Sequence, residues 1–93
     1  MKLALDANLP SAIARAVHAL LMPYGGRAIH IRDHFGPAVT DLEWIGKLHG
    51  DGGWAVLTAD RRLRTRPHER QALRDTELVV FILASGWNQA GYW

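Results

Sequence analysis

Two kinds of segment follow one another along the chain: short apolar runs, and longer segments whose apolar residues have helical spacing. The uninterrupted runs predict strands at residues 3–5, 54–58 and 78–83, and a weakly alternating segment predicts a strand at residues 27–31. The last run is continuously apolar, which is typical of a strand in the middle of a sheet covered on both faces. Strands that alternate with helices are joined by right-handed crossovers. The chain is therefore predicted to be an α/β protein with a mainly parallel sheet of about four strands.

The longest helical pattern covers residues 11–22 and ends at a Pro-Tyr-Gly-Gly sequence that stops a helix. We expect Arg15 and His18 to face water on this helix. The opposite side carries an apolar stripe made of Ile13, Ala16, Val17, Leu20 and Leu21.

Two further helices are predicted closer to the C-terminus. Thr40 is a good N-cap and Glu43 completes a capping box, which predicts a helix that continues to residue 49. A short helix is predicted from residue 68, after a proline. Residues 32–40 contain a Gly-Pro pair and are predicted to form a loop.

The 93-residue chain is 48% hydrophobic and 22% charged, the balance of a globular protein, and its length suits one domain over residues 1–93. Cysteine is absent, which excludes disulfides and thiolate metal sites. We find no signal peptide and no apolar run of about 20 residues, so we expect a cytoplasmic protein without a membrane span. The chain ends at residues 90–93 without a terminus signal, and we expect that a further helix has been lost there.

Three aspartates fall at equivalent places in this pattern. Asp6 follows the first predicted strand, Asp60 follows the third, and Asp41 begins the helix between the second and third. Parallel strands end at one edge of the sheet, where crossover helices also begin, so the three carboxylates are expected to converge. Like charges that close repel one another unless a cation neutralises them. An all-carboxylate group suits Mg²⁺ or Mn²⁺, and a water on such an ion can attack a phosphodiester.

Each of these residues also has a purely structural interpretation. Asp41 can support the first helical turn through the helix dipole, and Asp60 can begin a turn. Asn8 fits the N-cap of the first helix, whereas Asp6 lies too early for that role. The capping box accounts for Glu43, which becomes a fourth ligand if its side chain turns inward. Their joint placement at one edge favours function for the three aspartates.

Six of the eleven basic residues are arginines within residues 61–74. Arginine matches phosphate geometry with a bidentate fork, so this run predicts either a phosphate-binding face or a solvated helix face. In the first interpretation Arg61, Arg62 and Arg64 position the backbone of a nucleic acid, and binding depends strongly on salt.

Four motifs, in order and at the expected spacing, resemble those of the short PIN-like domains: LALDANLP, HIRDHF, TDLEWI and WAVLTADRRL. These domains are compact relatives of PIN-domain ribonucleases and include toxins of toxin–antitoxin pairs. The resemblance covers residues 3 to about 83 and implies a Rossmann-like three-layer fold, divalent-metal-dependent RNA cleavage, frequent dimerisation and an antitoxin partner. Asp6, Asp41 and Asp60 match the acidic metal ligands, and Asn8 matches the polar position beside the first.

Two departures from the family pattern reduce the acidic set. The typical PIN domain has a further acid on a helix between the second strand and the central helix, and this chain is predicted to be too short there to form it. Only Asp33 or Glu43 could substitute. After Asp60, relatives commonly have another acid and an aromatic, where this chain has Arg61-Arg62-Leu63. Fewer carboxylates imply a weaker metal site, and the arginines would bind substrate phosphates or an acidic antitoxin segment.

Three functions are compatible with these residues. The first is a divalent-metal-dependent endoribonuclease that is the toxin of a toxin–antitoxin pair, with Asp6, Asp41 and Asp60 holding Mg²⁺ or Mn²⁺. The alternative is a degenerate PIN-like module that binds RNA or a protein partner without cleaving it. The third is metal-dependent phosphatase chemistry on a small nucleotide.

Overall fold

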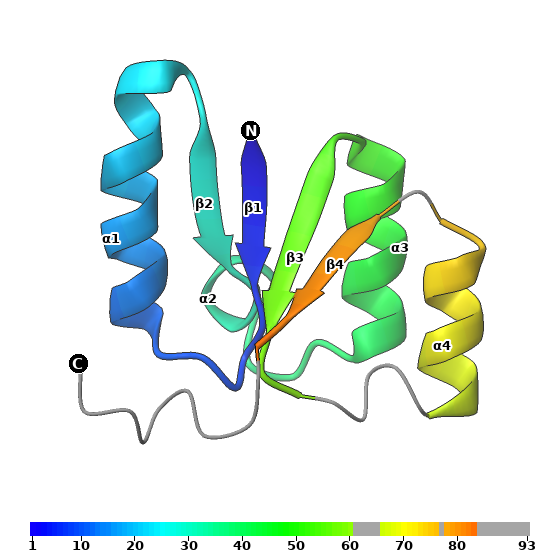
Figure 1. The fold of residues 1–93 in the computed structure, drawn as a ribbon. Coiled ribbons are helices and arrows are strands. Elements are labelled where there is room, and N and C mark those ends of the chain that lie inside the picture. Colours follow the sequence, from blue (N-terminus) through cyan, green and yellow to red (C-terminus); the bar gives the residue numbers. More distant parts are fainter. Residues whose placement is uncertain (61–65, 77, 84–93) are drawn as a thin grey trace.

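Four parallel strands form the centre of the computed structural model, which describes residues 1–60, 66–76 and 78–83 (Figure 1). The strand order across the sheet is β2-β1-β3-β4. The pairing confirms the predicted parallel α/β architecture, and every strand lies within two residues of its predicted bounds. The strands are β1 (Lys2–Leu5), β2 (Arg27–His30), β3 (Trp54–Thr58) and β4 (Val79–Ile82).

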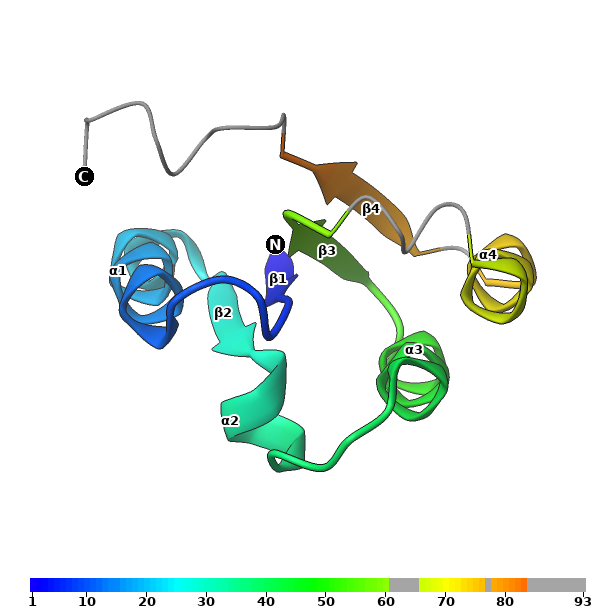
Figure 2. The ribbon, with the colours of Figure 1, turned by 90° about the horizontal axis from the view of Figure 1, so that it is seen from below.

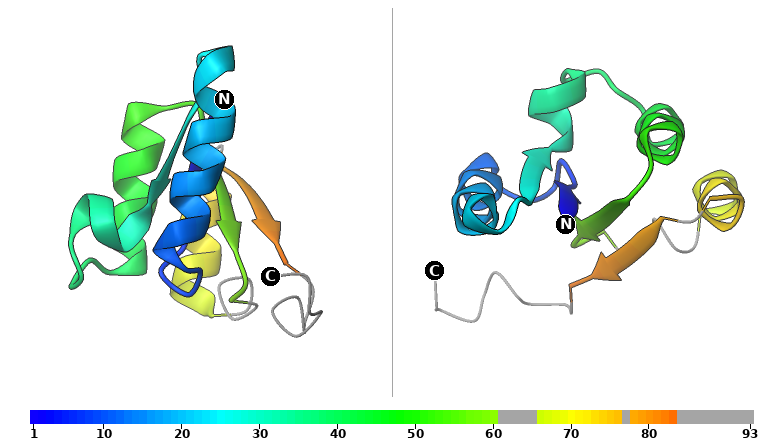
Figure 3. Two further views of the ribbon diagram at one scale, coloured as in Figure 1. Left: turned by 90° about the vertical axis from the view of Figure 1, so that its left-hand side faces the viewer. Right: turned by 90° about the horizontal axis from the view of Figure 1, so that it is seen from above.

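The helices cover both faces of this sheet, so the fold has three layers (Figures 2 and 3). Helix α1 (Ser11–Leu21), which continues into the 3-10 turn η1 (Met22–Tyr24), lies on one face. The opposite face carries α2 (Ile31–Phe35), α3 (Asp41–Asp51) and α4 (Pro67–Arg74). In the described part of the chain, no helix is long and apolar enough to cross a membrane.

Each face of the sheet has its own apolar core. Ala4 and Leu5 are adjacent in β1, so their side chains point to opposite faces of the sheet. Neither residue has exposed surface, which shows that both faces of β1 are covered. The core under α1 contains Leu5, Leu9, Ala14 and Ala28. The opposite core contains Ala4, Ile31, Trp44, Ile45, Leu48, Trp54 and Val56.

The strand order reverses direction at the centre of the sheet. The chain moves outward from β1 to β2, then returns past β1 to β3 and continues to β4. Right-handed crossovers in opposite directions place their helices on opposite faces, which explains why α1 is separated from α3 and α4. The reversal leaves a switch point between β1 and β3, at the carboxyl ends of the strands.

The prediction of a loop at residues 32–40 was wrong over its first part, because Ile31–Phe35 forms the helix α2. The prediction that the chain is too short for a helix before α3 was therefore also wrong. A five-residue helix is too short to show helical periodicity, and it is held here by burial of Ile31, which is 1% exposed. Gly36 ends it with a φ of 102°, a conformation that favours glycine.

The prediction that residues 78–83 lie in the middle of a covered sheet was wrong as well. Among the described strands β4 lies at one edge, and Val79 and Phe81 are each 53% exposed. Phe81 pairs in register with Leu57, whose side chain joins the core under α1. Helix α1 packs over β2 and does not extend across β4, so no described helix covers this part of the face (Figure 2).

The side of α1 that packs on the sheet differs in part from the apolar stripe that was predicted. Ala16 and Leu20 are exposed, and the side chains that pack on the sheet are Ile13, Ala14, Val17 and Leu21. His18, expected to face water, is half-buried, and its Nδ1 accepts a hydrogen bond of 3.0 Å from the backbone N–H of Ala28.

The capping box of α3 is confirmed. The backbone N–H of Glu43 donates to Thr40 Oγ1 at 3.2 Å, and the Thr40 hydroxyl donates to Glu43 Oε1 at 3.1 Å. The expectations about residues 84–93 lie outside the described part of the chain.

Candidate functional site

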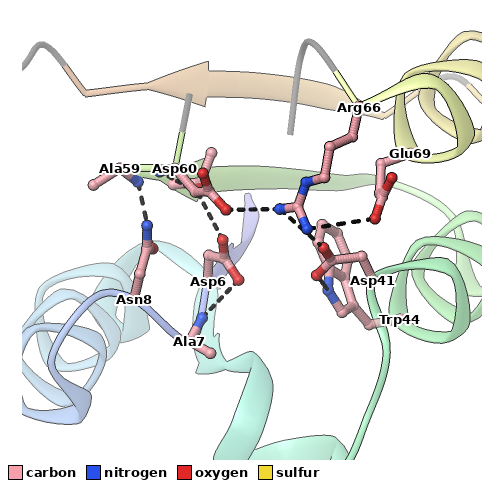
Figure 4. Close-up of polar contacts among 10 residues, drawn as sticks. Asp6, Ala7, Asn8, Asp41, Trp44, Ala59, Asp60, Arg66 and Glu69 are labelled. Carbon is pink, nitrogen blue, oxygen red and sulfur yellow. Dashed lines mark hydrogen bonds and ion pairs between the residues drawn. The ribbon is translucent and has the colours of Figure 1, made fainter. Parts of the chain in front are cut away.

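Asp6 and Asp60 follow the two central strands, on either side of the switch point (Figure 4). The backbone N–H of Asp6 donates to the Leu57 carbonyl at 2.9 Å, which continues the pairing of β1 with β3 beyond the end of β1. Asp6 therefore has a fixed backbone position beside the end of β3. Asp41 begins α3, whose first turn lies at the same edge of the sheet (Figure 4).

The Asp6 carboxylate is buried, with 7% of the residue exposed. Its Oδ1 accepts a hydrogen bond of 2.7 Å from the Ala7 N–H, and its Oδ2 accepts one of 2.7 Å from the Thr58 hydroxyl. Thr58 Oγ1 in turn accepts a hydrogen bond of 3.0 Å from the Asp60 N–H. One fully buried hydroxyl thus fixes the side chain of Asp6 and the backbone of Asp60.

Asp41 and Asp60 share a cation, the guanidinium of Arg66 (Figure 4). Arg66 Nη2 lies 2.8 Å from Asp60 Oδ2 and 3.6 Å from Asp41 Oδ2. Asp41 Oδ1 also accepts a hydrogen bond of 3.0 Å from the Trp44 indole N–H. The side chains of both aspartates are recessed, at 27% exposure for Asp41 and 17% for Asp60.

The other predicted site residues are placed less centrally. Asn8 does not cap α1, because the N-cap position is occupied by Pro10. Its Oδ1 instead accepts a long hydrogen bond of 3.5 Å from the Ala59 N–H, at the margin of the aspartate cluster. Glu43 stays exposed in the capping box with Thr40. Arg61, Arg62 and Arg64 lie outside the described residues.

Asp33, the other residue considered as a substitute acid, lies on α2. Its Oδ1 is 3.9 Å from the buried Nδ1 of His30, and its side chain is 60% exposed. The described contacts of Asp33 thus involve β2 rather than the three aspartates.

Three side chains of this site were not among the residues predicted from the sequence. Thr58 is the threonine of the T-x-D sequence that ends β3, a spacing that brings its hydroxyl to the Asp60 N–H. Trp44 is three residues after Asp41 on α3, a spacing at which helical side chains meet. Arg66 had no distinguishing signal, because it belongs to a run of six arginines.

The donor chemistry of this site fits a hard divalent cation, since carboxylate oxygens are the ligands that Mg²⁺ and Mn²⁺ prefer. The arrangement is different from a preformed metal site. Within the described residues, no three acidic or histidine side chains are grouped so that they could hold one ion. Two of the aspartates contact the guanidinium of Arg66 instead.

The fold and the site together define a doubly wound α/β domain with an acidic cluster at its switch point. The chain belongs to the PIN-like domain family, since a family model described as a PIN like domain matches residues 1–85. PIN-like domains are generally nucleases. No curated protein and no solved structure matched the chain.

Proposed function

We propose that this protein is a divalent-metal-dependent endoribonuclease and the toxin component of a toxin–antitoxin pair. One observation carries the proposal: Asp6, Asp41 and Asp60, which come from three separate elements, lie at one edge of the sheet in a member of a generally nucleolytic family. Carboxylate oxygens are the ligands that Mg²⁺ and Mn²⁺ prefer, so this edge has the donor chemistry of a cation site.

In this function Asp6, Asp41 and Asp60 hold Mg²⁺ or Mn²⁺, and the bound ion supplies an activated water and charge stabilisation for hydrolysis of a phosphodiester. Thr58 orients Asp6 through its hydroxyl, and Trp44 orients Asp41 through its indole N–H. These two side chains are positioning residues, because they act through the carboxylates.

RNA is the proposed substrate, and a basic segment directly follows Asp60. Arg61, Arg62 and Arg64 are proposed to bind its phosphates, which predicts that RNA affinity falls steeply with salt concentration. We also propose an antitoxin partner and a homodimer, and both proposals are based on the resemblance to PIN-like toxins.

A second function is favoured by the contacts of the same residues. Both oxygens of Asp6 already accept hydrogen bonds, and Arg66 already contacts Asp41 and Asp60. A site satisfied in this way is compatible with a degenerate module that binds RNA or a protein without cleaving it.

Cleavage of RNA by wild type and Asp6→Asn in the presence of Mn²⁺ separates the two functions. We expect the variant to lose at least about 100-fold in rate, because removal of even an outer-shell partner of a metal commonly costs about 10–100-fold. Asparagine keeps the shape of the side chain and can still accept the Thr58 hydrogen bond, so the fold is expected to persist.

The matched control is Asp75→Asn, which removes one exposed carboxylate that bonds to Gln71 at the end of α4. This variant is expected to cleave RNA like the wild type. Equal cleavage by Asp6→Asn and the wild type would refute the proposed roles, and no cleavage by either would favour the binding module.

A further inference from the structure

Arg66 is the residue at the centre of the acidic cluster. It precedes α4 directly, and its guanidinium points from there toward the first turn of α3 and the end of β3 (Figure 4). Besides its contacts with Asp60 and Asp41, its Nη1 lies 3.6 Å from Glu69 Oε1. One guanidinium therefore faces three carboxylates from three different parts of the fold.

The contacts of this guanidinium are uneven. Only the 2.8 Å contact with Asp60 has the length of a strong charge-assisted hydrogen bond, and the contacts with Asp41 and Glu69 are both 3.6 Å. The Nε atom is buried and has no hydrogen-bond partner among the described residues. This geometry neutralises charge but does not satisfy all the donors of the arginine, in contrast to a bidentate structural ion pair.

Arg66 and a divalent ion would need the same oxygen atoms. Nη2 contacts one Oδ2 of each of the two aspartates that the proposed function assigns to the metal. Carboxylate oxygens approach Mg²⁺ to about 2.0–2.1 Å, closer than either contact of Nη2, so an ion held by these oxygens would compete with the guanidinium for them. Two positive groups this close also repel each other, by an energy that rises as the site becomes less exposed to water.

We propose that Arg66 is a built-in counter-ion that competes with the divalent metal for Asp41 and Asp60. This inference rests on the proposed function and adds regulation to it: the acidic site is closed by its own arginine until metal displaces the guanidinium. Glu69 provides the displaced guanidinium with a partner one helical turn away on α4, at an (i, i+3) spacing.

Calorimetric titration with Mn²⁺ at neutral pH tests the competition, with wild type, Arg66→Gln and Arg66→Lys compared. We expect Arg66→Gln to bind Mn²⁺ about tenfold more tightly, because a positive charge next to the ion has been removed. Arg66→Lys keeps the charge and is expected to bind close to the wild-type affinity. Arg70→Gln, a charge removal on an exposed face of α4, is the matched control and is expected to change little.

The outcomes separate this inference from the proposed function. Equal Mn²⁺ affinity of the wild type and Arg66→Gln would overturn the competition and leave the metal site in place. Binding by Arg66→Gln alone would support the competition in its strongest form. No binding by any variant would overturn both proposals.

A measurement on the wild-type protein avoids any effect of the substitution on folding. The Arg66 Nε–H is buried and is therefore a suitable NMR probe of the guanidinium environment. We expect its signal to shift as Mg²⁺ is added and to saturate together with metal binding. Saturable Mg²⁺ binding that leaves this signal unchanged would contradict displacement of Arg66.

Discussion

Among the described residues, the two edges of the sheet carry different ionic clusters. At the amino end of the strands, Asp51 Oδ2 lies 2.9 Å from Lys2 Nζ and 3.7 Å from Arg27 Nη2, and it accepts a 2.7 Å hydrogen bond from the Trp54 indole. Both cations also lie over the Trp54 ring, at 5.0 and 4.9 Å from its centroid. One exposed carboxylate there has two cations.

Among the described residues at the carboxyl end of the strands, several carboxylates contact one guanidinium. Asp41, Asp60 and Glu69 share the guanidinium of Arg66, and Asp6 lies beside them with its oxygens bound only to neutral donors. Recessed like charges are costly to fold, whereas exposed ion pairs contribute little in either direction. In the proposed function the carboxyl edge binds a cation, whereas the ion pairs described at the amino edge are exposed and contribute little to stability.

Among the residues that orient the aspartates, Thr58 is expected to give the largest effect when it is replaced by valine. Valine keeps the shape but removes the hydroxyl that donates to Asp6 and accepts from the Asp60 N–H. We expect RNA cleavage to fall by about 10–100-fold, because the acids lose their orientation. Chemical denaturation should show a loss of about 1–3 kcal/mol, since buried polar groups are left unpaired.

Thr58→Ser is the matched control for this loss, because it restores the hydroxyl. Serine should recover most of the cleavage rate. A valine variant that cleaves at the wild-type rate would mean that the buried hydroxyl has no part in positioning the acids.

Trp44→Phe is expected to have a smaller effect on the same edge. It removes the indole N–H that donates to Asp41 Oδ1, while the contact of Asp41 with Arg66 remains. We expect a decrease of about tenfold in RNA cleavage, the lower end of the range for outer-shell partners. Single-turnover kinetics would measure it, and an unchanged rate would exclude an orienting role for the indole.

Much of the carboxyl edge could be predicted from the sequence. Apolar runs and one alternating segment located the four strands, and the positions of Asp6 and Asp60 just after two of these strands placed both aspartates at one edge. These features are local, because strand ends and helix starts are encoded by neighbouring residues.

The remaining features depend on how distant segments pack. The exposure of Phe81 follows from the limited reach of α1 across the sheet, which no local pattern records. Arg66 reaches Asp41 because α4 packs against α3, and nothing in the sequence distinguishes it from the other arginines of its run.

Asp51→Asn tests the amino edge and is expected to have the smallest effect. RNA cleavage should be unchanged, and the thermal midpoint should fall slightly at neutral pH. The hydrogen bond from Lys2 holds the pKa of the Asp51 carboxyl below its ordinary value of 3.8. Because the native pKa is the lower one, the stabilisation is complete above the unfolded pKa and is lost as the pH falls through the native pKa.

Thermal unfolding of the wild type and Asp51→Asn from neutral to strongly acidic pH measures this difference. The two midpoints should differ above about pH 4, the ordinary range of an aspartate, and converge in stronger acid. A loss of cleavage in Asp51→Asn would contradict the division of roles between the two edges.

Binding of a divalent ion by Asp6, Asp41 and Asp60 underlies every role proposed for the carboxyl edge. Calorimetric titration of the wild type and Asp6→Asn with Mn²⁺, side by side at neutral pH, measures this binding directly. We expect saturable binding by the wild type that is lost in the variant. Binding that survives the substitution would place the ion elsewhere and contradict the assignment of these three aspartates as its ligands.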